Sequence, residues 1–151
     1  MRIKNFLAIV SALCIASLAS AVEPTRVRCV LSEEARMHLA PDDDALAWPV
    51  ARFTPLHHVD TSGDWHLVRD LDNDLFWIHN RYVTANDYLV CGVIRAEQTD
   101  ARRGPGEEYE EAGKRYRYTG LRIVEYADGW VRGIDSDAQD VWVPEEAVLT
   151  F

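Results

Sequence analysis

The sequence predicts an all-β protein of two tandem small β-barrels that follow a cleaved leader. Each half of the chain holds short apolar runs separated by turn residues, and neither half has a useful length of helical periodicity. The halves also resemble each other. Four landmark pairs recur, Pro41 and Pro105 at a distance of 64 residues, then Trp65 and Trp130, Trp77 and Trp142, and Val83 and Val148 at 65 residues. A constant long offset indicates a duplicated module.

Residues 1–21 predict a secretory signal peptide that is cleaved after Ala21. Arg2 and Lys4 give a positive start, residues 6–18 are almost entirely apolar, and Ala19-Ser20-Ala21 matches an A-x-A cleavage site. The apolar run is shorter than the roughly 20 residues that a membrane-spanning helix needs. The mature protein is therefore expected in the periplasm or outside the cell, without membrane insertion.

The first copy is expected to occupy residues 22–86. Its apolar and β-branched runs predict strands at 56–60, 65–68 and 75–78. Thr61-Ser62-Gly63 predicts a tight turn between the first two of these strands. The aspartates from Asp70 to Asp74 predict an acidic turn before the third.

The second copy, residues 87–151, repeats this pattern. Strands are expected at 121–126, 130–134 and 140–143. Ala127-Asp128-Gly129 has the signature of a hairpin turn, and Asp135-Ser136-Asp137 predicts an acidic turn. The segment 144–148 predicts one turn of 3₁₀ helix that leads into a last short strand. About five short strands in some sixty residues are typical of a small barrel.

Four tryptophans stand at equivalent places in the two copies, which favours a role in the core: Trp65, Trp77, Trp130 and Trp142. Trp48 has no counterpart in the second copy. It is expected to be exposed, at the contact between the two copies.

The charge of the chain limits its partners. Cleavage removes Arg2 and Lys4, which leaves 14 basic and 25 acidic residues and a net charge of −11. So acidic a protein is not expected to bind nucleic acid or an anionic membrane surface by charge.

Two cysteines remain after cleavage, each within a short apolar run that precedes one copy. Cys29 and Cys91 are an even pair in an exported chain, which favours a disulfide. Such a bridge would close a loop of about sixty residues and stabilise the fold by roughly 3–4 kcal/mol. The alternative is a pair of buried free thiols.

Residues 100–109, Asp-Ala-Arg-Arg-Gly-Pro-Gly-Glu-Glu-Tyr, resemble the opening signature N-V-R-S-G-P-G-x-x-Y of bacterial SH3 (SH3b) domains. Gly129-Trp130 and Val141-Trp142-Val143 are similar to two later motifs of that family. The first copy carries Ala40-Pro41-Asp42 in place of G-P-G. The resemblance implies two tandem SH3-like barrels, and it implies modules that bind cell-wall peptides or proteins and are not enzymes.

A candidate ligand site lies in the second copy, where tyrosines and arginines are interleaved. Both side chains often anchor peptide interfaces. Over residues 115–118, a strand would place two tyrosines on one face and two arginines on the other. The alternative is one core face and one solvated face. The candidate ligand-binding residues are Tyr109, Tyr116, Tyr118, Tyr126, Arg103 and Arg115.

The sequence favours neither a metal site nor a catalytic site, and no cofactor is predicted. A calcium-binding loop that began at Asp70 would need glycine and glutamate where the chain has Leu75 and Arg81. The histidines lack zinc-binding spacings, and no G-x-S-x-G motif occurs.

Two functions remain open. The leading hypothesis is an exported, non-catalytic binding module that recognises a peptidoglycan peptide or a protein through an aromatic groove. The alternative is an acidic periplasmic inhibitor or immunity-type protein that caps a basic secreted partner, such as a cell-wall hydrolase toxin. The negative charge favours the alternative, because peptidoglycan carries carboxylates of its own.

Overall fold

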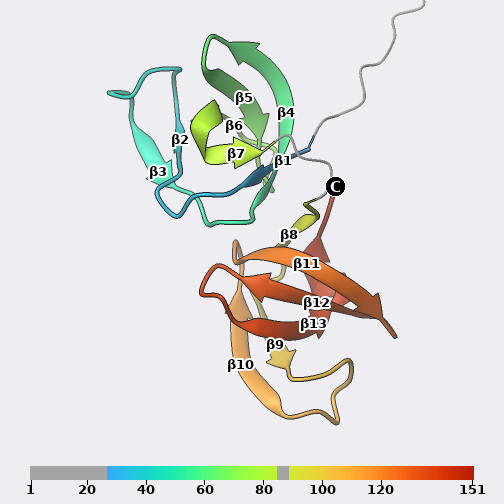
Figure 1. Ribbon diagram of the computed structural model, residues 1–151. Coiled ribbons are helices and arrows are strands. Elements are labelled where there is room, and N and C mark those ends of the chain that lie inside the picture. The colour runs from blue at the N-terminus through green and yellow to red at the C-terminus, as the bar shows by residue number, and fades with distance from the viewer. Residues whose placement is uncertain (1–26, 85–88) are drawn as a thin grey trace, which may run out of the picture.

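The computed structural model describes residues 27–84 and 89–151, which form two seven-stranded antiparallel sheets (Figure 1). The first sheet consists of β1 (Val27–Val30), β2 (Arg36–His38), β3 (Ala47–Pro49), β4 (Pro55–Ser62), β5 (Trp65–Arg69), β6 (Leu75–His79) and β7 (Val83–Thr84). The second consists of β8 (Cys91–Ile94), β9 (Gln98–Arg102), β10 (Glu111–Tyr116), β11 (Gly120–Ala127), β12 (Trp130–Asp135), β13 (Asp140–Pro144) and β14 (Val148–Leu149). The predicted leader, residues 1–21, lies outside the described residues.

Both sheets have the same strand order. The first runs β3-β2-β6-β5-β4-β1-β7 and the second runs β10-β9-β13-β12-β11-β8-β14. The edge strands of each sheet are not paired with each other, so neither sheet is closed into a barrel. The all-β prediction and the internal duplication are confirmed.

The irregular features of the two sheets recur as well. A register shift bends β4 between His58 and Asp60, and another bends β11 between Ile123 and Glu125. Short 3₁₀ helices lead into the last strands, η1 (Asn80–Tyr82) into β7 and η2 (Glu145–Ala147) into β14. These irregularities recur with the regular strands, whereas the register shift between Glu111 and Lys114 of β10 has no counterpart in β3.

Two bulky residues adopt left-handed backbone at equivalent places, Phe53 with φ 68° and Tyr118 with φ 70°. This conformation costs a residue with a Cβ about 1–2 kcal/mol. The Phe53 N–H donates to the carbonyl oxygen of Val30 at 2.7 Å, and the Tyr118 N–H donates to that of Ile94 at 3.0 Å. These hydrogen bonds hold the loop before β4 or β11 against the first strand of its own sheet.

The sequence predicted that the apolar runs with the cysteines precede the two copies. The structure instead places these runs within the sheets, as β1 and β8. β1 pairs with β4 and β7, and β8 pairs with β11 and β14. Their apolar character follows from this central place, because Val30 and Ile94 are fully buried in the two cores.

Each sheet wraps around its own apolar cluster. The first cluster contains Val30, Ala35, Val50, Leu56, Val68 and Ile78. The second contains Ile94, Ala101, Leu121, Val131, Val141 and Val143. The prediction that the four repeated tryptophans form the core is wrong: each is only partly buried, and none belongs to either cluster. Side chains alternate along a strand, so the buried Val141 and Val143 leave Trp142 on the opposite face.

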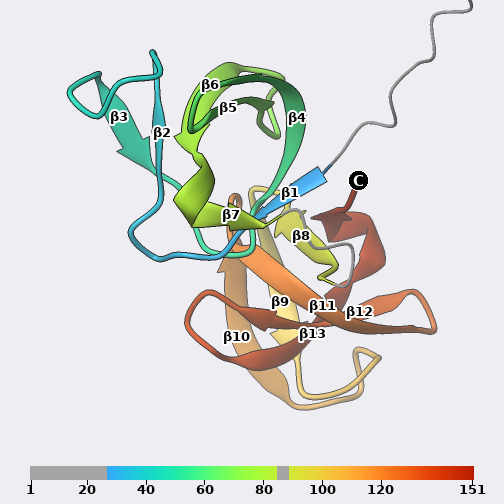
Figure 2. The same cartoon turned by 45° about the horizontal axis from the view of Figure 1, so that its top comes forward.

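A covalent bond joins the two halves where β1 and β8 lie side by side in both views (Figures 1 and 2). Cys29 and Cys91 form a disulfide with their Cα atoms 6.0 Å apart, as predicted. Phe53 packs with both cysteines in a third apolar cluster. A disulfide is typical of proteins from oxidising compartments and is compatible with a periplasmic or secreted protein.

Contacts at either side of the disulfide complete the junction. The rings of His57 and Phe151 lie 3.7 Å apart between centroids. Gly120 lies against the backbone of the first half so closely that a Cβ there would come within 2.0 Å of the Arg52 carbonyl oxygen. Glycine is required at this position because any side chain would push the halves apart.

In the described part of the chain, no helix has both the length and the apolar character that a membrane crossing requires.

Replacement of both cysteines by serine should lower the free energy of unfolding by about 3–4 kcal/mol, because the bridge closes a long loop of the unfolded chain. Urea denaturation without reductant measures the change. The unmodified protein in excess reductant is the matched control, and its denaturation midpoint should equal that of the double variant. Equal denaturation midpoints for the oxidised protein and the variant would contradict the expectation.

Candidate functional site

The four candidate tyrosines do not converge on one surface. Tyr109 lies in the loop between β9 and β10, where its ring covers Gly104. Tyr116 ends β10, and Tyr126 lies near the end of β11. The strand expected over residues 115–118 stops at Tyr116, so the predicted alternation of faces is interrupted. Tyr118 follows in the left-handed loop.

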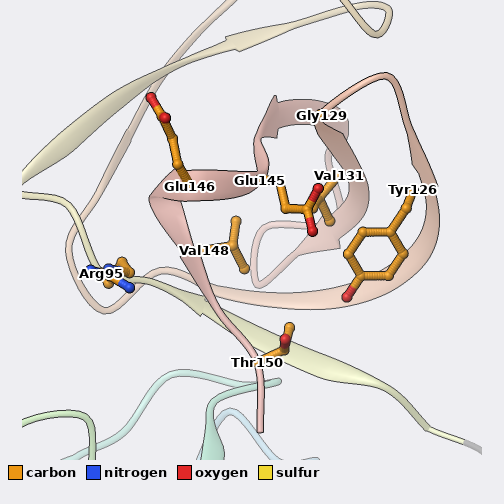
Figure 3. Close-up of a pocket in the computed structure, with 8 residues that line it drawn as sticks. All are labelled: Arg95, Tyr126, Gly129, Val131, Glu145, Glu146, Val148 and Thr150. Carbon is orange, nitrogen blue, oxygen red and sulfur yellow. The ribbon is translucent and has the colours of Figure 1, made fainter.

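Tyr126 lines a polar pocket at the end of the second sheet (Figure 3). The pocket has a volume of about 500 Å³. Val131 and Val148 form its floor, Tyr126 and Glu145 lie beside them, and the Glu146 carboxylate points away (Figure 3). Of the candidate residues, only Tyr126 lines it.

Of the two candidate arginines, Arg103 is exposed on the β9–β10 loop and Arg115 is enclosed. The Arg115 Nε donates to the Asp135 Oδ2 at 2.7 Å, and its Nη1 donates to the Ala112 carbonyl oxygen at 3.1 Å. The side chains are 13% exposed for Arg115 and 2% for Asp135. Arg115 therefore serves an internal ion pair.

A hollow with a mainly apolar lining lies largely in the first half, and we call it the acidic groove. Its volume is about 700 Å³. The lining residues are Glu33, Met37, Trp48, Pro49, Val50, Ala51, Thr54, Asp70, Leu71, Asp72, Asp74, Phe76 and, from the second half, Tyr118. Trp48 is 44% exposed, as predicted, and its ring lies 6.1 Å from that of Phe76 in an edge-to-face arrangement.

The strand order explains how these residues meet. β2 lies between β3 and β6 in the sheet, and it brings Met37 directly opposite Trp48. Phe76 comes from β6 on the other side of β2. The groove is therefore assembled from two consecutive strands and a third, β6, that is distant in sequence, and together they form an aromatic wall.

Carboxylates rim this aromatic wall. The Asp70 Oδ1 accepts hydrogen bonds from the backbone N–H groups of Asp72 and Asp74, both at 2.9 Å, and so closes the β5–β6 turn. Burial raises the pKa of Asp70 above its usual value, against the effect of these N–H groups, and the charges of Asp74 and Asp72 add to the increase.

The second half closes one end of the groove. The Tyr118 hydroxyl donates to the Asp72 Oδ2, and the Arg117 Nη2 donates to the Asp72 Oδ1. One of the six candidate ligand-binding residues thus reaches the groove. Trp48, Met37 and Phe76 were not among the candidates. The absence of a counterpart for Trp48 in the second copy was the sequence signal that pointed here.

Neither a protein-family model nor a curated protein matches this chain. Among residues 27–84 and 89–151, no group of three or more histidine, cysteine or acidic side chains is placed to hold a metal ion. The function must therefore be argued from the groove itself.

Replacement of Arg115 by methionine should destabilise the protein by about 3 kcal/mol, since Asp135 would stay buried without its cationic partner. Urea denaturation measures the effect. Arg103→Met, at an exposed arginine, is the control and should leave the midpoint unchanged. Similar midpoints for the two variants would show that the Arg115–Asp135 pair has no structural role.

Proposed function

We propose that this protein is an exported, non-catalytic binding protein that holds a basic polypeptide segment of a partner in the acidic groove. The observation that carries the proposal is the combination of an aromatic wall with carboxylates in one hollow: Glu33, Asp70, Asp72 and Asp74. Asp72 already pairs with Arg117, and the Glu33 Oε1 lies 3.9 Å from the Arg52 Nη1. Asp70 and Asp74 are therefore the carboxylates to which the described residues supply no cation. Aromatic side chains offer large, rigid contact area, and the carboxylates attract cationic groups.

The two halves are proposed to be SH3-like modules of the bacterial type. Two observations support this assignment, the motif resemblance around Gly104-Pro105-Gly106 and the small, bent antiparallel sheets that recur in both halves. The family typically binds peptides or proteins without catalysis, which agrees with a groove that offers contact area and charge.

Charge favours a basic protein partner over a peptidoglycan peptide. The whole chain carries a net charge of −9. Peptidoglycan has carboxylates of its own, which would meet the acidic rim with like charge. A cationic partner would instead be steered towards the groove, and its association rate would fall as salt is added. The alternative hypothesis, a cap on a basic secreted protein, is thus the better supported.

Two synthetic peptides that alternate apolar residues with either arginine or glutamate test this proposal by fluorescence anisotropy. The arginine peptide should bind and saturate, and Trp48→Ala should weaken it by at least about tenfold, which corresponds to roughly 1.4 kcal/mol. Tyr116→Ala, at an exposed ring outside the groove, is the matched control. Equal binding of the two peptides would contradict the proposal.

Sedimentation with purified peptidoglycan forms a second arm of the experiment. The unmodified protein is expected to stay in the supernatant at moderate salt. If the unmodified protein sediments with peptidoglycan and Trp48→Ala abolishes this, the ligand of the groove is a wall component and not a basic protein.

Affinity for the arginine peptide should fall as the pH is lowered from 7, and the fall should begin at a higher pH than the protonation of an ordinary aspartate would give. The raised pKa of Asp70 means that this carboxylate takes up a proton, and loses its negative charge, at a higher pH than the usual 3.9 of an aspartate. Asp70→Asn should bind more weakly at pH 7 and show a flatter pH profile. Anisotropy titrations across the range measure both, and an unchanged profile in the variant would exclude Asp70 as the titrating group.

A further inference from the structure

The second half contains an internal counterpart of the acidic groove that is filled by its own side chain. Val50 and Arg115 are 65 residues apart and are equivalent in the two sheets. Val50 borders the acidic groove, whereas the Arg115 side chain occupies the corresponding place beside Asp135. This position is therefore one of the differences between the two halves at the groove.

Asp70 in the first half and Asp135 in the second half are held by the same type of turn. The Asp135 Oδ1 accepts the N–H groups of Asp137 and Gln139 at 3.0 and 2.8 Å, as the Asp70 Oδ1 accepts those of Asp72 and Asp74. The backbone repeats too: the N–H of each aspartate donates at 3.0 Å to the carbonyl oxygen four residues later. Both turns therefore fix their aspartate in the same way and leave Oδ2 available.

Asp70 and Asp135 differ in the hydrogen-bond partner of their Oδ2 atom. In the second half it accepts the Arg115 Nε at 2.7 Å. In the first half, no residue of 27–84 or 89–151 forms a side-chain hydrogen bond or an ion pair with the Asp70 Oδ2. Partial burial without a cation is the physical reason that the pKa of Asp70 is raised.

A second polar group in the groove also lacks a partner. Thr54 lines the groove and is only 4% exposed, and its hydroxyl oxygen has no hydrogen-bond partner within the described chain. An unsatisfied buried hydroxyl costs free energy that a ligand donor would recover. The groove thus offers one carboxylate oxygen and one hydroxyl oxygen to incoming N–H groups.

We propose that the acidic groove recognises an arginine side chain of the ligand, whose guanidinium takes at Asp70 the place that Arg115 takes at Asp135. This inference rests on the proposed function and names the group that the groove selects. A guanidinium has five N–H donors in a fixed plane, so it can serve Asp70 and Thr54 together. Its flat face and apolar stem suit the rings of Trp48 and Phe76.

Lysine fits less well for the same reasons. Its ammonium is a compact, strongly hydrated charge without the planar fork, and it stacks less readily on aromatic rings. The filled groove of the second half is occupied by an arginine, although the residue before it, Lys114, is a lysine whose Nζ pairs with Asp100 at 2.8 Å. The groove should therefore discriminate between the two basic residues.

Three peptides that differ only at one residue test the proposal on the mature, disulfide-bonded protein. The residue is arginine, lysine or citrulline, the last being a neutral analogue of arginine. The arginine peptide should bind at least about tenfold more tightly than the citrulline peptide, as the loss of a charge-assisted hydrogen bond predicts. The lysine peptide should lie between them. Equal affinities would overturn the inference.

Protein variants locate the effect. Asp70→Asn should weaken the arginine peptide by about tenfold and remove the preference over citrulline. Asp74→Asn is the matched control, because it removes the same charge from the same rim without touching the Asp70 carboxylate. Thr54→Val should reduce the preference in part. If Asp70→Asn and Asp74→Asn behave alike, general charge attraction explains the binding and the inference fails.

Val50→Arg keeps the inference testable should Asp70→Asn unfold the turn. This variant gives the first half the arginine that the second half has. Val50 belongs to the first apolar cluster, so circular dichroism must first show that the variant folds. The folded variant should fill the groove and abolish binding of the arginine peptide. Unimpaired binding by a folded Val50→Arg protein would refute the inference.

The proposed function and the selectivity for arginine can fail separately. If none of the peptides binds the unmodified protein, the proposed function is lost. If all three bind equally and Trp48→Ala still weakens them, the groove remains a binding site and only its selectivity for arginine is excluded.

Discussion

The acidic groove depends on the junction between the two sheets, where a disulfide and a glycine set how closely the halves approach. The Cys29–Cys91 bond ties β1 to β8, and Gly120 leaves room for the Arg52 backbone. This approach brings Tyr118 to Asp72, and so closes one end of a hollow that the first sheet alone would leave open. The stability of the fold and the shape of the acidic groove are thus linked through one junction.

Much of the fold could be predicted, because strands with strong apolar patterns are encoded locally. β11, β12 and β13 were expected within one or two residues of their bounds, and Asp128-Gly129 turns as its sequence indicates. Short polar strands were predicted less well. A strand was expected over residues 115–118, whereas β10 runs from Glu111 to Tyr116 and its polar sequence is held as a strand by its partner β9. The tryptophans misled because their recurrence in both copies suggested the core, whereas aliphatic residues fill it.

The site could be predicted only in part, because its walls come from strands that meet through the sheet order. A cluster of tyrosines in sequence did not become a cluster in space, and Tyr118 reached the groove only because its loop faces the other half. Arg115 was expected on a binding surface and is instead the internal partner of Asp135. Arg115 is informative by comparison, because it supplies the second half with a cation beside Asp135, whereas the equivalent Asp70 in the first half has none among the described residues.

The contacts between the halves are reciprocal, and this has a consequence for stoichiometry. Phe53 and Tyr118 are equivalent residues, and each reaches into the opposite half, Phe53 beside Cys91 and Tyr118 beside Asp72. Two identical chains that paired in this manner around a two-fold axis would display the same hollow twice. The two halves of a single polypeptide need not be identical. The groove of the first half stays open, whereas Arg115 fills the equivalent place in the second half. If the acidic groove is the binding site, as proposed, such a molecule would be monovalent and would form one-to-one complexes without cross-linking its partners into larger assemblies.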